Sequence, residues 1–224
     1  MKRIKLSQRN LPDYTHGEEI FNMVSHIAGG AVGIVALVLC IITAAIHKNV
    51  YGVVSSSVYG ASMIILYSFS SIYHGLNPQL TAKKVFQILD HCSIFLLIAG
   101  TYTPICLCTL REYSTALGWT LFGIVWAAAI VGITLNSIDI KMFHKFSAVC
   151  YLVMGWCIAA AWKALPYMIS NGGMLLLLLG GICYTIGAGF YYFLKKKRYM
   201  HSVFHIFVVI GSLLQMFYIL LYVV

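Results

Sequence analysis

Apolar residues gather into long runs along this chain, and short polar stretches separate one run from the next. A helix needs about 20 apolar residues to cross the hydrocarbon core of a bilayer. Seven runs are about that long, and they cover residues 21–46, 50–73, 85–110, 115–135, 146–164, 174–194 and 199–224. The pattern therefore predicts an all-α integral membrane protein, built as a bundle of seven transmembrane helices.

The composition agrees with this class and leaves no room for a water-soluble domain. Hydrophobic residues make up 61% of the 224 residues and charged residues 9%, far from the averages of globular domains. Residues 1–20 are polar and basic, and no apolar signal region with a small-residue cleavage site follows them. We expect a cytoplasmic N-terminal segment over residues 1–20, no cleaved signal peptide, and a seven-helix membrane domain over residues 21–224.

The distribution of charge predicts the orientation in the membrane. A net charge of +9 could indicate binding to nucleic acid, but the basic residues lie in short segments between spans and act as topology signals. Lys48, Arg111 and Lys163 fall on one side of the alternating spans, and the other twelve of the fifteen Lys and Arg residues fall on the opposite side. The positive-inside rule places the N-terminus in the cytoplasm and the C-terminus outside. No nucleic-acid partner is expected.

Residues inside the runs and loops carry smaller structural predictions. All seven cysteines lie within or beside apolar runs and form no Cys-x-x-Cys pair, so we expect small buried hydrophobes and neither disulfides nor a zinc knuckle. Pro104 should kink its helix. Lys83 lies in the predicted loop before the third span. Residues 136–145 are predicted to form a polar loop in which Asp139 and His144 are solvated.

The last span opens with two histidines, His201 and His205, spaced four residues apart. Residues at this spacing lie one above the other on one face of a helix, so both imidazoles can reach one metal ion. Polar side chains at the mouth of a membrane helix are costly and need a reason. The alternative is a pair of interfacial histidines that form hydrogen bonds with lipid or backbone.

The alternation of seven spans brings other polar residues to the same face. The same membrane face receives the start of the first span, the end of the second, the start of the third and the start of the seventh. The unusual polar residues at these positions are Glu19, Asn22, His26, Ser70, His74, Asp90, His91, His201 and His205. His47 lies at the opposite face and His16 precedes the spans, so both are predicted to be interfacial or solvated.

Three of these residues form a candidate metal site. His74, His201 and His205 would supply three imidazole nitrogens and leave a fourth position open to water, which is the arrangement of a catalytic zinc ion. Asp90 is the best candidate to orient that water or accept its proton. Ser70, one turn before His74, could bond to an imidazole, to the water or to a substrate carbonyl. The alternative is a polar cluster that fixes helix ends and binds no metal.

Two further groups of residues are predicted to support the site. Glu19, Asn22 and His26 are interpreted as a network at the start of the first span that lies behind the ligands. His91 directly follows Asp90 and therefore points to a different face of its helix, which favours a structural or interfacial role.

These polar residues also resemble the motifs of a known family. Glu19-Ile-Phe-Asn22-Met-Val-Ser-His26, then Ser70-Ser-Ile-Tyr-His74 with Leu89-Asp90, and finally His201-Ser-Val-Phe-His205 resemble the three ordered motifs of the hemolysin III and progestin/adipoQ receptor superfamily. The resemblance spans nearly the whole chain. It implies seven helices and an intracellular zinc site with His74, His201 and His205 as ligands. It also implies that Asp90 holds the zinc-bound water and that Ser70 is its neighbour.

The resemblance also bears on function and location. Relatives in the wider superfamily, including alkaline ceramidases, cleave lipid amides. The short chain is similar to the bacterial hemolysin III branch, which implies a multi-pass protein of a bacterial cell membrane. The receptor branch has a long cytoplasmic N-terminal region that is absent here, so hormone binding is not implied.

Three functions are therefore compared, with a membrane lipid as the expected partner and the oligomeric state left open. The first is a zinc-dependent hydrolase that acts on a lipid amide or ester. The second is a non-enzymatic protein of membrane-lipid homeostasis or signalling with structural zinc. The third is a cytolytic or channel-like protein, although the spans carry no rings of charge and no long amphipathic segment. A retinal protein is excluded because the last span has no lysine for a Schiff base.

Overall fold

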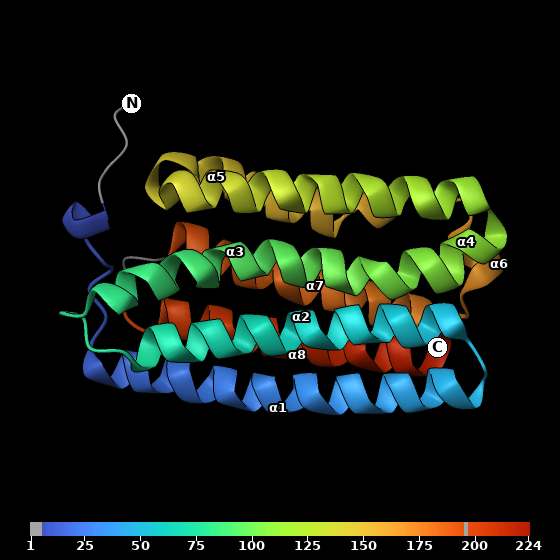
Figure 1. The fold of residues 1–224 in the computed structure, drawn as a ribbon, viewed down its shortest axis with the longest axis horizontal. Coiled ribbons are helices and arrows are strands. Elements are labelled where there is room, and N and C mark those ends of the chain that lie inside the picture. Colours follow the sequence, from blue (N-terminus) through green and yellow to red (C-terminus); the bar gives the residue numbers. More distant parts are fainter. Residues whose placement is uncertain (1–5, 195–196) are drawn as a thin grey trace.

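The computed structural model describes residues 6–194 and 197–224, and every regular element in these ranges is helical (Figure 1). The long helices lie side by side along one direction. Six helices in the described ranges are long and apolar enough to cross a membrane. In order, the elements are η1 (Leu6–Gln8), α1 (His16–Ile46), α2 (Val50–Gly75), α3 (Thr81–Pro104), the π-helix η2 (Ile105–Leu110), α4 (Arg111–Tyr113), α5 (Thr115–Gly155), the 3-10 helix η3 (Cys157–Ala161), α6 (Leu165–Met168), α7 (Asn171–Phe193) and α8 (Met200–Tyr222).

The first helix begins at His16, five residues before the predicted start of its span, because a capping box closes its N-terminus. The Thr15 backbone N–H donates to the Glu18 carboxylate at 2.9 Å, and the Glu18 N–H donates back to the Thr15 hydroxyl. The second carboxylate oxygen of Glu18 accepts the N–H of Tyr199 at 2.7 Å. This contact joins the beginning of α1 to the beginning of α8.

The helices of this bundle carry small or polar residues inside and large apolar residues outside. On α1, the buried positions include Asn22, His26 and Gly29, whereas Ile27 and Ile34 are more than half exposed. Lipid tails are as apolar as leucine, so helix association in a membrane relies on close packing and polar contacts. The distribution fits a protein whose outer surface faces lipid, and it lets polar groups collect in the interior.

A change of helix type follows Pro104. Proline has no N–H to donate to the carbonyl four residues earlier, and its ring crowds that carbonyl. The backbone accommodates this by continuing as the π-helix η2 directly after Pro104. The expected disturbance of the helix thus takes the form of a π-helix.

The predicted loop over residues 136–145 is wrong, because α5 remains helical on both sides of a single break at Asp139. Asp139 has an extended backbone (φ −163°, ψ 106°), and its carboxylate accepts the N–H groups of Lys141 and Met142 at 2.9 and 3.1 Å. It therefore caps the helix that follows. Asp139 is buried, so the prediction of a solvated loop residue is also wrong.

The chain turns back on itself at this break. Ser147 donates to the Asn136 side-chain oxygen at 2.6 Å, and Asn136 donates to the Tyr151 hydroxyl at 3.2 Å. In a straight helix, residues 11 positions apart would be separated by about 16 Å. The ribbon accordingly doubles over itself along the top row of Figure 1.

Three further sequence predictions need correction. His144 is a helical residue whose ring packs against Tyr191 and Tyr192, so it is not a solvated loop histidine. Lys83 lies in the first turn of α3 and is 2% exposed, so it is not a loop charge. The predicted span over residues 146–164 is α-helical only as far as Gly155 and then forms the 3-10 helix η3. The short helix α6 begins directly after this span, with Pro166 in its first turn.

The prediction for the cysteines holds in part. All seven are free, and four of them are buried, whereas Cys150, Cys157 and Cys183 are partly exposed. Of the basic residues used to predict orientation, Lys2, Arg3, Lys5, Lys195 and Lys196 lie outside the described residues.

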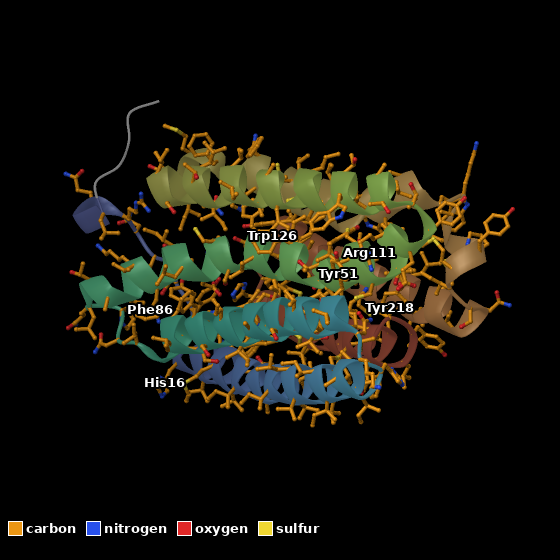
Figure 2. The ribbon with its side chains drawn as sticks, turned by 45° about the vertical axis from the view of Figure 1, so that its right-hand side comes forward. His16, Tyr51, Phe86, Arg111, Trp126 and Tyr218 are labelled. Atoms are coloured by element: carbon orange, nitrogen blue, oxygen red, sulfur yellow. The ribbon has the colours of Figure 1, made fainter. Side chains whose placement is uncertain are left out.

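The bundle has two distinct ends. His16, the first residue of α1, lies at one end, whereas Arg111 and Tyr51 lie at the other, where the guanidinium stands 3.8 Å from the centre of the Tyr51 ring (Figure 2). The C-terminus lies at the Arg111 end (Figure 1). The predicted polar positions gather toward the His16 end.

The reversal of α5 makes a prediction about stability. Replacing Asn136 with alanine removes the partner of Ser147 and one of the partners of Tyr151 inside the protein. We expect Asn136→Ala to lower the free energy of unfolding by about 1–3 kcal/mol. The exposed control Thr134→Ala, which loses only a bond to a carbonyl of its own helix, should change it by less than about 0.5 kcal/mol. Denaturant unfolding in one detergent measures both, and equal effects would contradict the assignment.

Candidate metal centre

Three buried imidazoles converge near the His16 end of the bundle. His74 lies in the last turn of α2, whereas His201 and His205 lie on successive turns of α8. The Nε2 atom of His201 is 3.3 Å from that of His74 and 3.0 Å from that of His205. One nitrogen from each ring lies within 4.8 Å of the others, so the group can hold a metal ion.

Neighbouring acceptors determine where the protons of two of these rings reside. The Nδ1 atom of His74 is 2.6 Å from a carboxylate oxygen of Glu19, and an ionised carboxylate only accepts. The Nδ1 atom of His205 faces the backbone carbonyl of Asn22 at 3.3 Å. Both rings therefore carry their proton on Nδ1 and turn the Nε2 lone pair inward.

The arrangement leaves more lone pairs than protons at the point of convergence. The Nε2 atom of His201 lies close to both inward lone pairs and can donate one proton at most. Buried acceptors that face one another without a donor are unfavourable. A cation among the three nitrogens removes this conflict, so the donor set fits a metal ion.

Glu19 is held in turn by a buried lysine. The Nζ atom of Lys83 is 2.7 Å from the other carboxylate oxygen of Glu19, and it also donates to the carbonyl of Leu76 at 2.9 Å. These contacts connect α1, α2 and α3 around His74. Sequence reasoning missed this role of Lys83. Its position just before the predicted third span, at the same membrane face as His74, was the available signal.

Asn22 connects α1 to α8. Its side-chain oxygen accepts the hydroxyl of Ser202 at 2.7 Å, while its backbone carbonyl faces His205. Both side chains are buried. Ser202 was not singled out in the sequence, although its place between the two histidines of the motif could have indicated it.

His26 contacts a ligand histidine through its ring. It stacks on His205 with ring centres 3.6 Å apart and planes 16° apart, and it meets Tyr67 edge-on at 5.0 Å. His26 is 3% exposed, and neither of its nitrogens has a hydrogen-bond partner in the described part of the chain. Glu19, Asn22 and His26 were predicted to support the site, and each contacts it differently. Glu19 binds His74 and Lys83 through its carboxylate, Asn22 bonds to Ser202 and faces His205, and the His26 ring stacks on His205.

Tyr14 packs against two of the three imidazoles. Its ring stacks on His201 with centres 4.9 Å apart and planes 17° apart, and it lies 5.7 Å from His74. Burial raises the pKa of the Tyr14 phenol well above its ordinary value, so the ring is neutral. Arg9 fixes the preceding segment by donating to the carbonyl of Ile138 at 2.9 Å. A single tyrosine outside the spans gave no sequence signal for this role.

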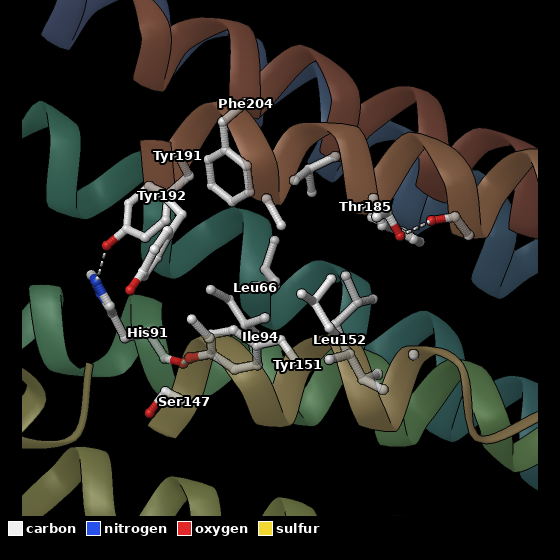
Figure 3. Close-up of a pocket in the computed structure, with 18 of the residues that line it drawn as sticks. Leu66, His91, Ile94, Ser147, Tyr151, Leu152, Thr185, Tyr191, Tyr192 and Phe204 are labelled. Atoms are coloured by element: carbon white, nitrogen blue, oxygen red, sulfur yellow. Dashed lines mark hydrogen bonds between the residues drawn. The ribbon is translucent and has the colours of Figure 1, made fainter. Parts of the chain in front are cut away.

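A cavity of about 610 Å³ extends from the imidazoles into the bundle. Its polar end includes the side chains of His26, Ser70, Asp90, His201 and His205. Away from this end the walls are mainly apolar and are supplied by α2, α3, α5, α7 and α8. The apolar lining includes Leu66, Ile94 and Leu152 (Figure 3). The lining of this cavity suits a ligand with one polar end and an apolar part.

The two predicted catalytic residues line this cavity outside the three-histidine group. One carboxylate oxygen of Asp90 lies 3.8 Å from Nδ1 of His91. The Ser70 hydroxyl is fully buried and has no hydrogen-bond partner among the described residues. His91 faces the Gln87 carbonyl at 2.9 Å and the Tyr191 hydroxyl at 3.3 Å (Figure 3), which agrees with a structural role.

The contact between Glu19 and His74 makes a prediction about metal affinity. Glu19→Gln removes the charge that orients His74 and pairs with Lys83. We expect the variant to bind Co²⁺ about 10–100-fold more weakly than the unmodified chain. Glu112→Gln, an exposed carboxylate at the other end of the bundle, should leave affinity unchanged. Titration of the Co²⁺ absorption bands measures both, and equal affinities would show that Glu19 does not support the site.

Comparison with known proteins places the sequence of this chain in a family. Residues 14–216 match the model of a family described as Haemolysin-III related. The chain is 44% identical to Hemolysin-3 of Bacillus cereus over 206 residues, which are 92% of either protein. It is 41% identical to a Hemolysin-3 homolog of Bacillus subtilis (strain 168) over 211 residues, 94% of this chain and 97% of that protein. It is 24% identical to human monocyte to macrophage differentiation factor over 164 residues, 69% of this chain and 64% of that protein.

Proposed function

This chain belongs to the Haemolysin-III related family of multi-pass membrane proteins, and from that premise we propose that it is a zinc-dependent hydrolase of a lipid amide or ester in a bacterial cell membrane. The observation that carries the proposal is the group of three imidazoles, two of which, His201 and His205, line the polar end of an apolar cavity. Such a site offers a metal with an open position next to space for an acyl chain.

The spacing of the imidazole nitrogens supports zinc. Zinc binds histidine nitrogens at about 2.0–2.1 Å in a tetrahedral arrangement, so two of its ligand nitrogens are about 3.3 Å apart. The observed separations of 3.3 and 3.0 Å are close to this value. Neutral imidazoles suit Zn²⁺, and three of them with no fourth side chain are typical of catalytic sites.

Each residue around the site has its own role in the proposed hydrolysis. Held by His74, His201 and His205, a zinc ion would supply a Lewis acid and would lower the pKa of a bound water towards neutrality. The Asp90 carboxylate accepts the proton of the attacking water and returns it to the amine or alcohol that leaves as the C–N or C–O bond breaks. Ser70 donates its hydroxyl proton in a hydrogen bond to the substrate carbonyl. Glu19 keeps the His74 ring in place. The apolar walls bind the acyl chain and exclude bulk water.

The alternative function is non-enzymatic, with structural zinc in a protein of lipid homeostasis or signalling. The contacts of Glu19, Lys83 and Asn22 favour it, because they connect the ends of α1, α2, α3 and α8 around the imidazoles. Cytolysis rests only on the name Hemolysin-3, which belongs to the relatives.

We also propose that the chain crosses the membrane seven times, with the N-terminus inside and the C-terminus outside. The reversal of α5 at Asp139 supports two crossings in residues 115–161. Arg9 contacts Ile138, so the reversal lies at the same end as the N-terminal segment. The C-terminus lies at the other end (Figure 1).

Reporter fusions test this topology. Alkaline phosphatase, which is active only outside the cytoplasm, is fused after Tyr113, Lys141 or Val224. We expect activity at Tyr113 and Val224 and none at Lys141, because the chain reverses between the fourth and fifth crossings. An active Lys141 fusion or an inactive Val224 fusion would contradict the proposed orientation.

The hydrolase proposal predicts that Asp90 and His74 can be separated by mutation. Asp90→Asn should keep about one zinc per chain, with affinity lowered no more than about 10–100-fold. It should lower turnover of a lipid amide about 100-fold or more, because an amide cannot accept the proton of water. His74→Ala should lose zinc and turnover together. Metal analysis and an assay of fatty-acid release, both in one detergent, measure the two effects.

The same measurements can reject parts of the proposal. If Asp90→Asn empties the site as fully as His74→Ala, Asp90 is a ligand and not the proton acceptor. If the unmodified chain binds zinc but hydrolyses no lipid amide or ester, the non-enzymatic alternative is preferred. The exposed His16 serves as a control, since His16→Ala should change neither zinc content nor turnover.

A further inference from the structure

His26 is a buried polar side chain whose hydrogen-bonding capacity is unused. Its ring is 3% exposed, and neither nitrogen has a hydrogen-bond partner in residues 6–194 and 197–224. Leaving a buried donor and acceptor unpaired destabilises the folded protein. A hydrocarbon ring would fill the same space without that cost. The presence of an imidazole therefore indicates a partner other than the described residues of the chain.

The stacking geometry argues that this partner is not the metal held by His205. A metal bound to an imidazole lies close to the plane of the ring, at about 2.0–2.1 Å from the nitrogen. The His26 ring is nearly parallel to that of His205, and the ring centres are 3.6 Å apart. An ion in the plane of His205 would thus lie well off the plane of His26. His26 is next to the metal site without being one of its ligands.

Ser70 is the second unpartnered group at this position. Tyr67, Ser70 and His74 are separated by three and four residues, so they share one face of α2. His26 meets Tyr67 edge-on at 5.0 Å and stacks on His205, whose ring is 5.0 Å from that of His74. His26 therefore lies across from the segment of α2 that carries Ser70, and both residues line the polar end of the cavity.

We propose that His26 is a substrate-binding residue, whose neutral imidazole donates a hydrogen bond, together with Ser70, to the carbonyl oxygen of the lipid amide or ester. This inference rests on the proposed hydrolase function and adds a contact to it. Negative charge develops on that oxygen when the carbonyl is attacked. Donors already positioned in a site without bulk water stabilise this charge, and removing one such donor lowers turnover about 100–1,000-fold.

Two substitutions separate hydrogen bonding from packing. His26→Phe keeps a ring that can stack on His205 and meet Tyr67, but it cannot donate. His26→Gln keeps an N–H donor and loses the aromatic ring. If His26 only packs, Phe should resemble the unmodified chain and Gln should be impaired. If His26 binds the carbonyl, Phe should be the more impaired variant.

The experiment uses the full-length chain and both variants in one detergent. Turnover of an N-dodecanoyl amide with a fluorescent amine is measured on zinc-loaded protein, and binding of dodecanamide is measured on metal-free protein. We expect His26→Phe to hold one zinc per chain, to unfold at the same or a higher temperature, and to lose about 100-fold in kcat/KM. It should bind dodecanamide about 10-fold more weakly, because the hydrogen bond to the carbonyl is lost. His26→Gln should retain more turnover and binding than His26→Phe.

Each outcome separates this inference from the hydrolase proposal. If the unmodified chain hydrolyses the amide and His26→Phe equals it in turnover and binding, the inference is overturned and the hydrolase stands. If nothing is hydrolysed but His26→Phe binds dodecanamide more weakly than the unmodified chain, the carbonyl contact stands and the hydrolase fails. If His26→Gln is weaker than His26→Phe in both measurements, or if the unmodified chain does not bind dodecanamide at all, the inference is overturned.

Discussion

The carboxylate of Glu19 is the interaction on which the polar end of this bundle depends. One oxygen accepts from His74 on α2, and the other pairs with Lys83 on α3. In a poorly solvated interior, an unpaired charge is expensive, so removing any member leaves the others destabilised. The same contacts determine the proton position of His74 and hold three helix ends together. Metal binding and the packing of these helices are therefore parts of one structure.

A membrane environment explains how so many polar groups can share this interior. Large apolar side chains such as Ile27 and Ile34 face outward, which leaves the inner face of α1 to Asn22, His26 and Gly29. In a water-soluble bundle, the interior has to supply the hydrophobic driving force. Here lipid contacts satisfy the apolar residues, and internal polar contacts add to helix association. An interior site with several histidines is thus compatible with a stable fold.

The sequence predicted the features that depend on spacing along the chain. The pair His201 and His205 follows from helical periodicity, and His74 follows from the alternation of spans, because both are one-dimensional patterns. It failed where a side chain acts through a distant partner. Lys83 looks like a loop charge until Glu19 is placed opposite to it. Asp139 was predicted to be solvated because it lies in a polar stretch of the sequence. That stretch does not indicate that the chain reverses there, or that Asp139 caps the next helix by accepting the N–H groups of residues 141 and 142.

The unused polar capacity at this end of the bundle is of two complementary kinds. Among the imidazoles, the inward lone pairs of His74 and His205 outnumber the available protons, which favours a cation. Beside them, the N–H of His26 and the hydroxyl of Ser70 have no acceptor in the described part of the chain. A carbonyl group satisfies both conditions at once, because its oxygen is attracted by a cation and accepts hydrogen bonds. The apolar cavity that continues from this point provides space for the chain attached to such a group. The chemical character of the missing partner thus follows from the groups that the protein leaves unsatisfied.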